Sequence, residues 1–273
     1  MKKAARLCLC ALVTACLAVS CGLSGGRKAI VADTPETAVE SASAAPGYEM
    51  PATRQGSGEQ ILHREGYTVS YNGTTRLPNW VAWHLTADHV DGPYKRKGVA
   101  FQEDMEVETP RATTADYTSS GYDRGHMCPS GDCKWSENAQ RESFLLTNVC
   151  PQVHGLNAGD WNEMEAQCRR WAKKYGDLYI VCGPILYGKS RRKTIGSNKV
   201  VVPEAFFKVV LRTGKDTAAI GFIYKNAPGN RPKGDYANTV DEVERITGYD
   251  FFPNLPDDTE RKVESEADTG TWF

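Results

Sequence analysis

The chain has 273 residues, of which 40% are hydrophobic and 25% are charged. This ordinary globular composition allows a sizeable core and excludes disorder along the whole length. The length suits one large domain or two small ones. The net charge of −1 identifies no partner by itself, although a near-neutral domain can still bind nucleic acid where its basic residues cluster.

The first 21 residues have the features of a targeting segment. A positively charged start, with Lys2, Lys3 and Arg6, precedes an apolar run over residues 7–19, which is short for a membrane span. The run ends in Ala-Val-Ser-Cys at residues 18–21, which resembles a bacterial lipoprotein cleavage box. We therefore expect a lipid anchor on Cys21, attachment to a membrane, and a place in the bacterial cell envelope, either as an outer-membrane lipoprotein or in the periplasm.

Two alternatives to this targeting prediction stay open. A second box of similar sequence ends at Cys16, but cleavage there would leave apolar residues at the new terminus. An uncleaved anchor or a plain secretory signal would also export the chain. Each alternative places the rest of the chain outside the cytoplasm.

Composition divides the remainder into three parts. Residues 22–58 are rich in small and polar residues, which predicts a flexible linker because such a segment buries too little apolar surface to fold. Residues 59–256 have a globular composition throughout and form one predicted domain. Residues 257–273 carry six acidic and two basic residues. This acidic tail is either disordered or docked through its last two residues, Trp272 and Phe273.

Five of the nine cysteines follow the targeting segment, namely Cys128, Cys133, Cys150, Cys168 and Cys182. An exported protein can form disulfides, but an odd number leaves at least one thiol free or paired between chains. These five contain no Cys-x-x-Cys pair, so a structural zinc site is not expected.

Strand and helix patterns are mixed within the predicted domain. Strands are expected over residues 67–71, 80–85, 144–149 and 178–182, and over 199–212 with a break at Pro203. Residues 217–224 form the expected hairpin partner of that last run across Gly214. Helices are expected over 137–143 after the cap residue Ser136, and from the capping box at Thr239 to Gly248. Strands and helices without regular alternation predict an α+β fold.

The clearest helix lies near residues 158–175. One apolar stripe recurs there at helical spacing, formed by Trp161, Met164, Cys168, Trp171 and Tyr175. Basic residues occupy the other side of this helix, so it should pack its stripe against the core.

The first segment whose residues could take part in catalysis reads Tyr-Asp-Arg-Gly-His-Met at residues 122–127. Histidine is the usual general base near neutral pH, and the neighbouring Arg124 has the fork-shaped side chain that binds phosphate oxygens. Gly125 allows a close approach of another group. A single histidine beside a glycine is more often structural, so His126 needs support from elsewhere in the chain.

That support comes from residues 147–165. Asn148 ends an expected strand, Asn157 stands at or just before the start of the striped helix, and Glu165 follows two turns later. Asn157 and Glu165 lie roughly 80° apart around the helix axis, so both can face one cleft. Amide and carboxylate oxygens suit Mg²⁺, which needs few protein ligands. Taken singly, Asn157 is equally a helix cap and Glu165 a solvated residue.

Together these motifs resemble the DNA/RNA non-specific endonucleases of the ββα-metal (His–Me finger) superfamily. The resemblance rests on Asp-Arg-Gly-His at 123–126, on the intervals of nine and eight residues from Asn148 to Asn157 to Glu165, and on the segments 77–83 and 202–209. It covers about residues 60–255. It implies a central antiparallel sheet flanked by helices, with a ββα-metal finger as the active site, and cleavage of DNA and RNA with little sequence preference.

The resemblance also implies a role for each matching position. His126 would be the general base that activates water, Asn157 the direct ligand of one Mg²⁺ or Mn²⁺ ion, and Glu165 a holder of metal-bound waters. Arg124 would contact the phosphate. Asn148 would help to orient the base or the substrate, and Arg96 is the candidate for a further arginine upstream.

A basic run in an expected loop comprises Lys189, Arg191, Arg192 and Lys193. It either follows the nucleic-acid backbone or is a solvated charged loop.

The same residues allow two rival functions. A cysteine protease or transferase would use Cys128 or Cys150 as its nucleophile, but it leaves the spacing of Asn148, Asn157 and Glu165 unexplained. A catalytically decayed, nucleic-acid-binding surface lipoprotein is opposed by the expected residue type at every mapped position. His63, His84, His89 and His154 lack a comparable constellation, which favours structural or surface roles for them.

Overall fold

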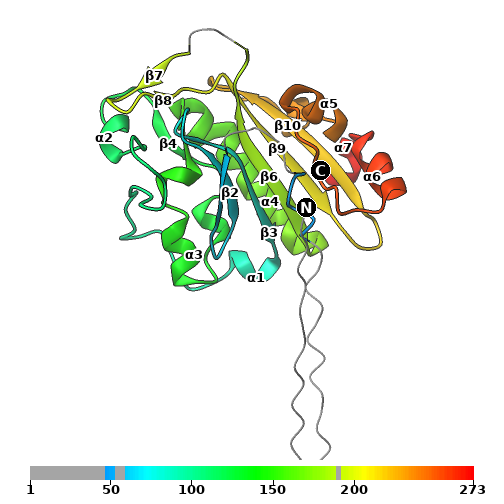
Figure 1. Ribbon diagram of the computed structural model, residues 1–273. Helices are drawn as coiled ribbons and strands as arrows, with labels where there is room; N and C mark the ends of the chain where they lie inside the picture. The colour runs from blue at the N-terminus through cyan, green and yellow to red at the C-terminus, as the bar shows by residue number, and fades with distance from the viewer. Residues whose placement is uncertain (1–46, 53–58, 189–191) are drawn as a thin grey trace, which may run out of the picture. The chain divides into compact units, whose positions relative to one another are not determined.

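A seven-stranded antiparallel sheet organises the chain from residue 59 onward in the computed structural model, which describes residues 47–52, 59–188 and 192–273 (Figure 1). Its strands follow the order β1-β2-β3-β6-β9-β10-β11. Their bounds are β1 (Glu59–His63), β2 (Thr68–Asn72), β3 (Leu77–Leu85), β6 (Leu178–Ile185), β9 (Ala205–Arg212), β10 (Ala218–Lys225) and β11 (Ala237–Asn238). Two small antiparallel pairs accompany it, β4 (Asp123–His126) with β5 (Val149–Gln152) and β7 (Thr194–Ile195) with β8 (Val200–Val201).

Helices cover both faces of this sheet (Figure 1). Their bounds are α1 (Ala87–Val90), α2 (Thr114–Tyr117), α3 (Glu137–Glu142), α4 (Asn162–Tyr175), α5 (Val240–Thr247), α6 (Asp257–Glu264) and α7 (Thr269–Trp272). The central strands β6 and β9 are buried along their whole length, because each face packs on a separate apolar core. One core contains Ile180 of β6 with Met164 and Trp171 of α4, and the other contains Val181 of β6.

The second core joins the sheet to α5 and α6. Val240 and Val243 of α5 and Val263 of α6 bury their side chains in it. α5 starts where the Thr239 side chain accepts a hydrogen bond from the Glu242 N–H, at 3.1 Å, and ends at Gly248 with φ 72°. That left-handed conformation is the one glycine adopts without strain at the end of a helix.

A ββα unit is formed by β4, β5 and α4. His126 pairs with Val149 and Gly125 with Cys150 across the two strands. Gly125 has no room for a side chain, because a Cβ atom there would lie 2.0 Å from Gln152 Oε1. A π-helical turn, Leu156–Trp161, leads into α4, and the Trp161 Nε1–H donates to the His126 carbonyl at 3.1 Å. The helix is thereby fixed to the strand that carries the histidine.

These findings confirm the α+β class, the antiparallel sheet flanked by helices and the helix with an apolar stripe. The expected strand over 144–149 is wrong, because the chain forms a 3₁₀ turn at Leu146–Asn148 and only then enters β5. The side chain of Asn148 is buried and bonds to the backbone there, which favours a turn over an extended strand. Residues 199–212 form two strands, β8 and β9, on either side of Pro203.

Both ends of the described chain pack on the domain. Within the predicted linker, the Tyr48 ring contacts Tyr179 at 5.2 Å and the Ala52 N–H bonds to the Asp250 carbonyl at 2.9 Å. Within the acidic tail, Trp272 is 1% exposed, and its carbonyl accepts a hydrogen bond from Trp171 at 2.6 Å. The tail is therefore docked through Trp272. No helix among the described residues has the length and apolar character needed to cross a membrane.

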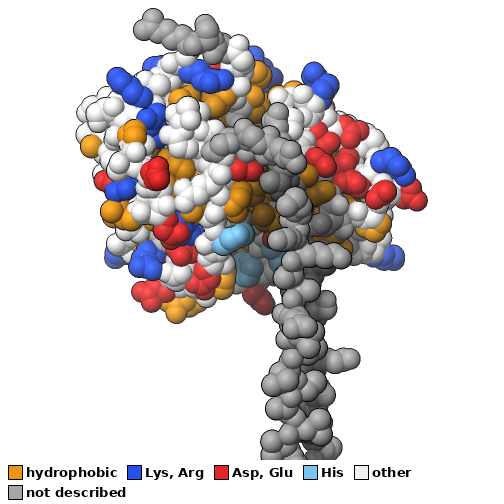
Figure 2. Space-filling view, viewed as in Figure 1, with side chains coloured by type: hydrophobic (Ala, Val, Ile, Leu, Met, Phe, Trp, Pro, Cys, Tyr) orange, Lys and Arg blue, Asp and Glu red, His pale blue; other side chains and the backbone are white. Residues whose placement is uncertain are grey.

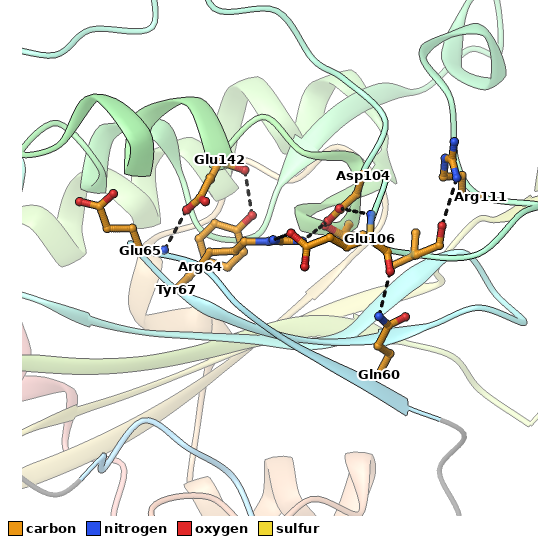
Figure 3. A network of polar contacts seen from close by, with 10 residues as sticks. Gln60, Arg64, Glu65, Tyr67, Asp104, Glu106, Arg111 and Glu142 are labelled. Carbon is orange, nitrogen blue, oxygen red and sulfur yellow. Dashed lines mark hydrogen bonds and ion pairs between the residues drawn. The ribbon is translucent and has the colours of Figure 1, made fainter.

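A polar network fixes the segment that follows residue 100 (Figure 3). Arg64, at the turn between β1 and β2, forms ion pairs with Asp104 at 2.6 Å and with Glu106. Asp104 also accepts a hydrogen bond from Thr147 at 2.7 Å, and the Tyr67 hydroxyl donates to the carbonyl of Glu142 at 2.8 Å. These bonds hold the segments around Asp104 and Glu142 against the turn between β1 and β2.

Candidate active site

His126 occupies the end of β4, and its ring contacts two aromatic side chains that also contact each other. The ring centroids of Phe101 and Phe144 each lie 4.9 Å from that of His126. The Nε2 atom is buried and has no hydrogen-bond partner among the described residues. Burial, followed by the nearby charge of Arg96, lowers the pKa of His126 to about 3. The imidazole is therefore neutral at pH 7 and has a lone pair that can accept a proton.

A cleft of about 530 Å³ opens beside this histidine. It brings together five of the residues predicted for the site from sequence, namely Arg96, Arg124, His126, Asn157 and Glu165. Phe101, Tyr117, Tyr122 and Asp123 complete its polar and aromatic walls. The prediction that Asn157 and Glu165 face one cleft agrees with this lining.

Asn157 lies in the π-helical turn that precedes α4 and is not the helix cap that its residue type also suggested. Its Nδ2 donates to Asp123 Oδ2 at 2.9 Å, and His154 Nδ1 approaches the same oxygen at 2.8 Å. Because the amide nitrogen is engaged, the Oδ1 atom is the one left to coordinate a cation. Oxygen donors from Asn157 and Glu165 around one polar cleft fit a hard ion such as Mg²⁺.

Glu165 extends from α4 over a buried cation. Burial raises the pKa of Glu165 to about 7, against the opposing charges of Lys208 and Arg169. Lys208 is only 1% exposed, and its Nζ lies 4.5 Å from the ring of Trp161 and 4.9 Å from that of Trp83. The carboxylate of Glu165 therefore has charge compensation from beneath the cleft.

Asp132 belongs to the same buried group. Arg169 donates to its Oδ1 at 2.9 Å and the Trp83 Nε1–H to its Oδ2 at 3.1 Å. Sequence reasoning missed Lys208 and Asp132 as parts of the site. The available signal was a lysine within Ala-Phe-Phe-Lys-Val-Val-Leu, residues 205–211, because a lone charge in a fully buried strand requires a partner.

The two predicted arginines reach the cleft from different segments. Arg124 of β4 lies over the rings of Phe101 at 5.5 Å and Tyr117 at 5.9 Å, and donates to the Thr114 carbonyl at 3.4 Å. Arg96 is exposed and lies 5.7 Å from the Phe144 ring. Arg124 is thus held in place by packing, whereas Arg96 is free to follow a ligand.

Asn148 does not line the cleft, so its position gives no support to a role in orienting the substrate, whereas a role in orienting the base stays a prediction. The side chain is fully buried. It accepts from the Cys128 N–H at 2.9 Å and donates to the carbonyls of Cys128 and Ser143, both at 2.8 Å. With its donors and acceptor engaged, Asn148 acts on the site only by fixing the backbone two residues after His126.

The predicted basic loop is described in part. Lys189 and Arg191 lie outside the described residues. Arg192 donates to the Tyr187 carbonyl at 3.5 Å and does not line the cleft. The next residue, Lys193, places its Nζ 4.8 Å from the ring of Tyr122, which does line it. The loop therefore reaches the cleft through Lys193.

All five cysteines of the domain are free and buried. Burial raises the pKa of Cys128 and Cys150 well above the ordinary value for a thiol. A cysteine nucleophile requires the thiolate, so these two thiols are unsuited to that role. The geometry therefore does not support a cysteine protease or transferase.

Comparison with known proteins identifies relatives over most of the chain. A family model described as DNA/RNA non-specific endonuclease matches residues 47–258. Nuclease EXOG, mitochondrial, of Danio rerio is 37% identical over 73% of this chain and 62% of its own length. Endonuclease G, mitochondrial, of Homo sapiens is 34% identical over 72% of this chain and 70% of its own length. The chain thus spans less than two thirds of the zebrafish relative.

A fungal relative and a solved structure extend the comparison. Nuclease C1 of Cunninghamella echinulata var. echinulata is 37% identical over 73% of this chain and 85% of its own length. The solved structure is that of an EndoG/EndoGI complex, which addresses the mechanism of EndoG inhibition. It superposes with a TM-score of 0.71 at 30% identity and covers 79% of this chain and 91% of that chain.

The predicted location in a bacterial cell envelope is wrong by these comparisons. The zebrafish, human and fission-yeast relatives are mitochondrial nucleases of eukaryotes. A basic start without acidic residues, followed by a short apolar run, does not distinguish an export signal from an organellar one. Cys21 and the rest of the targeting segment lie outside the described residues, and none of the relatives supports a lipid anchor.

Proposed function

Because the chain belongs to the DNA/RNA non-specific endonuclease family, we propose that it hydrolyses phosphodiester bonds of DNA and RNA with one divalent metal ion. The observation that carries this proposal is the position of His126 on the wall of a cleft that Asn157 and Glu165 also line. A neutral base, oxygen ligands and a phosphate-binding arginine are the groups that this hydrolysis needs.

His126 would act as the general base. Its lowered pKa keeps the ring neutral, and contacts with Phe101 and Phe144 limit its rotation. A neutral ring on the cleft wall can remove a proton from the water that attacks phosphorus. Arg124, held over two aromatic rings, would bind the phosphate oxygens as their negative charge increases.

Asn157 would hold Mg²⁺, or Mn²⁺, through Oδ1, and Glu165 would contact it through water. The bound ion would polarise the phosphate and offset the charge on the leaving oxygen. Asp123 fixes the amide of Asn157 by accepting its Nδ2–H at 2.9 Å. Glu165 would be ionised in this state, since a cation favours the carboxylate over the neutral acid.

Nucleic acid would be bound through its backbone. The cleft shares residues with one further hollow, which in turn shares residues with a second. These two hollows are lined by Lys95, Lys97, Lys134, Arg141 and Arg169. Arg96 lines both the cleft and one of these hollows, and Lys193 of the basic loop contacts the ring of Tyr122, which lines the cleft. Since the sugar-phosphate backbone is common to every sequence, such contacts require no base-reading element.

Incubation of the purified protein with plasmid, single-stranded DNA and RNA tests the proposal. Cleavage of all three is expected with Mg²⁺ or Mn²⁺ and is expected to stop on chelation. If all three substrates stay intact with metal, the proposal fails. Retained binding without cleavage would instead favour a decayed, nucleic-acid-binding protein.

Two variants separate the roles within the site. His126→Ala should lose about 10²–10⁴-fold in rate and keep its affinity for metal and DNA. Asn157→Ala should weaken metal binding, so that higher Mg²⁺ partly restores its activity. The exposed His63 gives the control His63→Ala, which should cleave like the wild type. Loss of metal binding in His126→Ala with normal metal binding in Asn157→Ala would reverse the assignment.

A further inference from the structure

Three carboxylates meet on the opposite face of the sheet from the cleft. Asp241 and Glu244 belong to α5, and Glu264 is the last residue of α6. One carboxylate oxygen from each lies within 4.8 Å of the other two. Figure 2 shows acidic side chains gathered over these two helices. Because Val243 and Val263 pack in one core, the two helices hold the three carboxylates together.

Glu264 is the least accessible of the three. It is 6% exposed, and its Oε1 atom is buried without a hydrogen-bond partner among the described residues. Glu244 is half-buried and accepts one hydrogen bond, from the Phe251 N–H at 2.7 Å. Asp241 is exposed, which leaves one side of the cluster open to water.

The cluster has no positive partner in the described part of the chain. The nearest arginines along the two helices are used elsewhere, Arg245 with Glu242 at 2.7 Å and Arg261 with Asp258. Burial, then the charge of neighbouring carboxylates, raises the pKa of Glu264 to about 9. Glu260 and Asp250 are among those neighbours. A buried carboxylate among like charges is unfavourable unless a cation or a proton compensates it.

We propose that Asp241, Glu244 and Glu264 bind a divalent cation, for which Ca²⁺ is the best fit. Ca²⁺ takes six to eight oxygen ligands in flexible geometry and accepts carboxylates in one- or two-oxygen contact. Three carboxylates supply the charge, the open side at Asp241 supplies water, and Glu264 Oε1 gains the partner that it lacks. The ion would link α5 to α6 and so strengthen the attachment of the C-terminal segment.

Ca²⁺ titration of the full chain, freed of metal with a chelator, tests this site. Calorimetry of the wild type should show a Ca²⁺ site that does not depend on Asn157, and thermal unfolding should shift upward. At a Ca²⁺ concentration 100 times Kd, the ratio of folded to unfolded protein rises about 100-fold, which is a shift of roughly 5–10 °C for a domain of this size. Asn157→Ala, which changes the proposed catalytic metal site, should keep this response.

Variants of the cluster decide the outcome. Glu264→Gln should abolish the Ca²⁺ response. Asp241→Asn, at an exposed position that leaves packing unchanged, should weaken the Kd at least about 10-fold because affinity follows the number of charged ligands. Asp258 is on α6, like Glu264, but outside the cluster, so Asp258→Asn should respond to Ca²⁺ like the wild type. Equal stabilisation of the wild type and Glu264→Gln, or no calorimetric binding by the wild type, would overturn the proposal.

Nuclease assays keep this result separate from the proposed function. Glu264→Gln should cleave plasmid with Mg²⁺ at the wild-type rate, because its site lies across the sheet from His126. A Ca²⁺ response in a protein without nuclease activity would support the new site and reject the proposed function.

Discussion

Buried carboxylates stand on both faces of the central sheet, but their surroundings differ in charge. Beneath the cleft, Asp132 is paired with Arg169 at 2.9 Å, and Glu165 faces Lys208 and Arg169. Across the sheet, Glu264 faces Glu244, Glu260, Asp241 and Asp250. The first face thus carries its own compensating cations, whereas the second depends on a cation or protons taken from solution.

The two carboxylates show how neighbouring charges modify the effect of burial on a pKa. Burial is the largest cause of the raised pKa of both Glu165 and Glu264. The pKa of Glu165 rises only to about 7, with cations beside it, and that of Glu264 to about 9, with acids beside it. The neighbours, more than the depth, decide which carboxylate remains charged at neutral pH.

Removal of the compensating cation should give the largest effect. Lys208→Met deletes a charge that is 1% exposed and leaves Glu165 and Asp132 facing less positive charge. Loss of one partner from a buried charge pair costs about 3–5 kcal/mol, and Lys208 compensates these carboxylates through its charge, so the free energy of unfolding should fall by up to that amount in urea denaturation. Lys225→Met, at the exposed end of β10, is the control and should change little.

A second substitution sharpens this result. Glu165→Gln added to Lys208→Met removes one of the uncompensated charges and should restore part of the lost stability. If Lys208→Met alone is as stable as Lys225→Met, the lysine does not compensate the carboxylates and the contrast between the two faces is lost.

On the other face of the sheet, neutralisation of Glu264 should raise the free energy of unfolding, whereas loss of Lys208 should lower it. The folded-state pKa of Glu264, about 9, lies above its ordinary value of 4.5. The stability linked to its proton is therefore complete below about pH 4.5 and is lost as the pH rises toward 9. In chelator at pH 8, Glu264→Gln should be more stable than the wild type, by on the order of 1–3 kcal/mol.

Denaturation curves from pH 5 to pH 9 measure this prediction. The stability of the wild type should fall relative to that of Glu264→Gln across the window, and Ca²⁺ should remove most of the gap at pH 8. A variant that is less stable than the wild type at every pH would mean that the Glu264 carboxylate forms favourable contacts, contrary to the repulsion described here.

Local sequence predicted the cleft far better than it predicted either set of buried charges. His126, Asn157 and Glu165 lie within one ββα unit, where strand pairing and helix periodicity bring together residues separated by known intervals. Lys208 reaches Glu165 only because β9 lies beneath α4 in the folded chain, which no spacing within the sequence indicates.

Glu264 and Asn148 show why the sequence could not predict the position of every functional side chain. Glu264 reads as one charge in an acidic tail until α6 packs on α5 and turns it inward. The spacing of Asn148 matches a family position, but spacing cannot tell whether an amide faces a ligand or the backbone. Two of its three backbone hydrogen bonds are a tertiary property, since they join a turn to Cys128, twenty residues earlier and just after β4.

The smallest predicted effect concerns His126, where burial acts on a base and not on an acid. Burial lowers the pKa of His126 to about 3, and the charge of Arg96 is the lesser cause. Phe101→Ala would admit water to one side of the ring and should raise the pKa toward its ordinary 6.5, by about one unit or more. Arg96→Ala should raise it less, since Arg96 is exposed and its charge is screened by salt.

Nitrogen-detected NMR titration of the metal-free protein from about pH 2 to about pH 8 brackets the pKa of about 3 and measures both shifts, with the exposed His63 as an internal reference. The cleavage rate of Phe101→Ala should decline at a higher pH than that of the wild type as the solution is made more acidic, because the protonated ring cannot accept a proton. If Arg96→Ala raises the pKa of His126 more than Phe101→Ala does, charge and not burial controls this base. The two faces of the sheet would then follow the same rule, in which neighbouring charges outweigh depth for the base as well as for the acids.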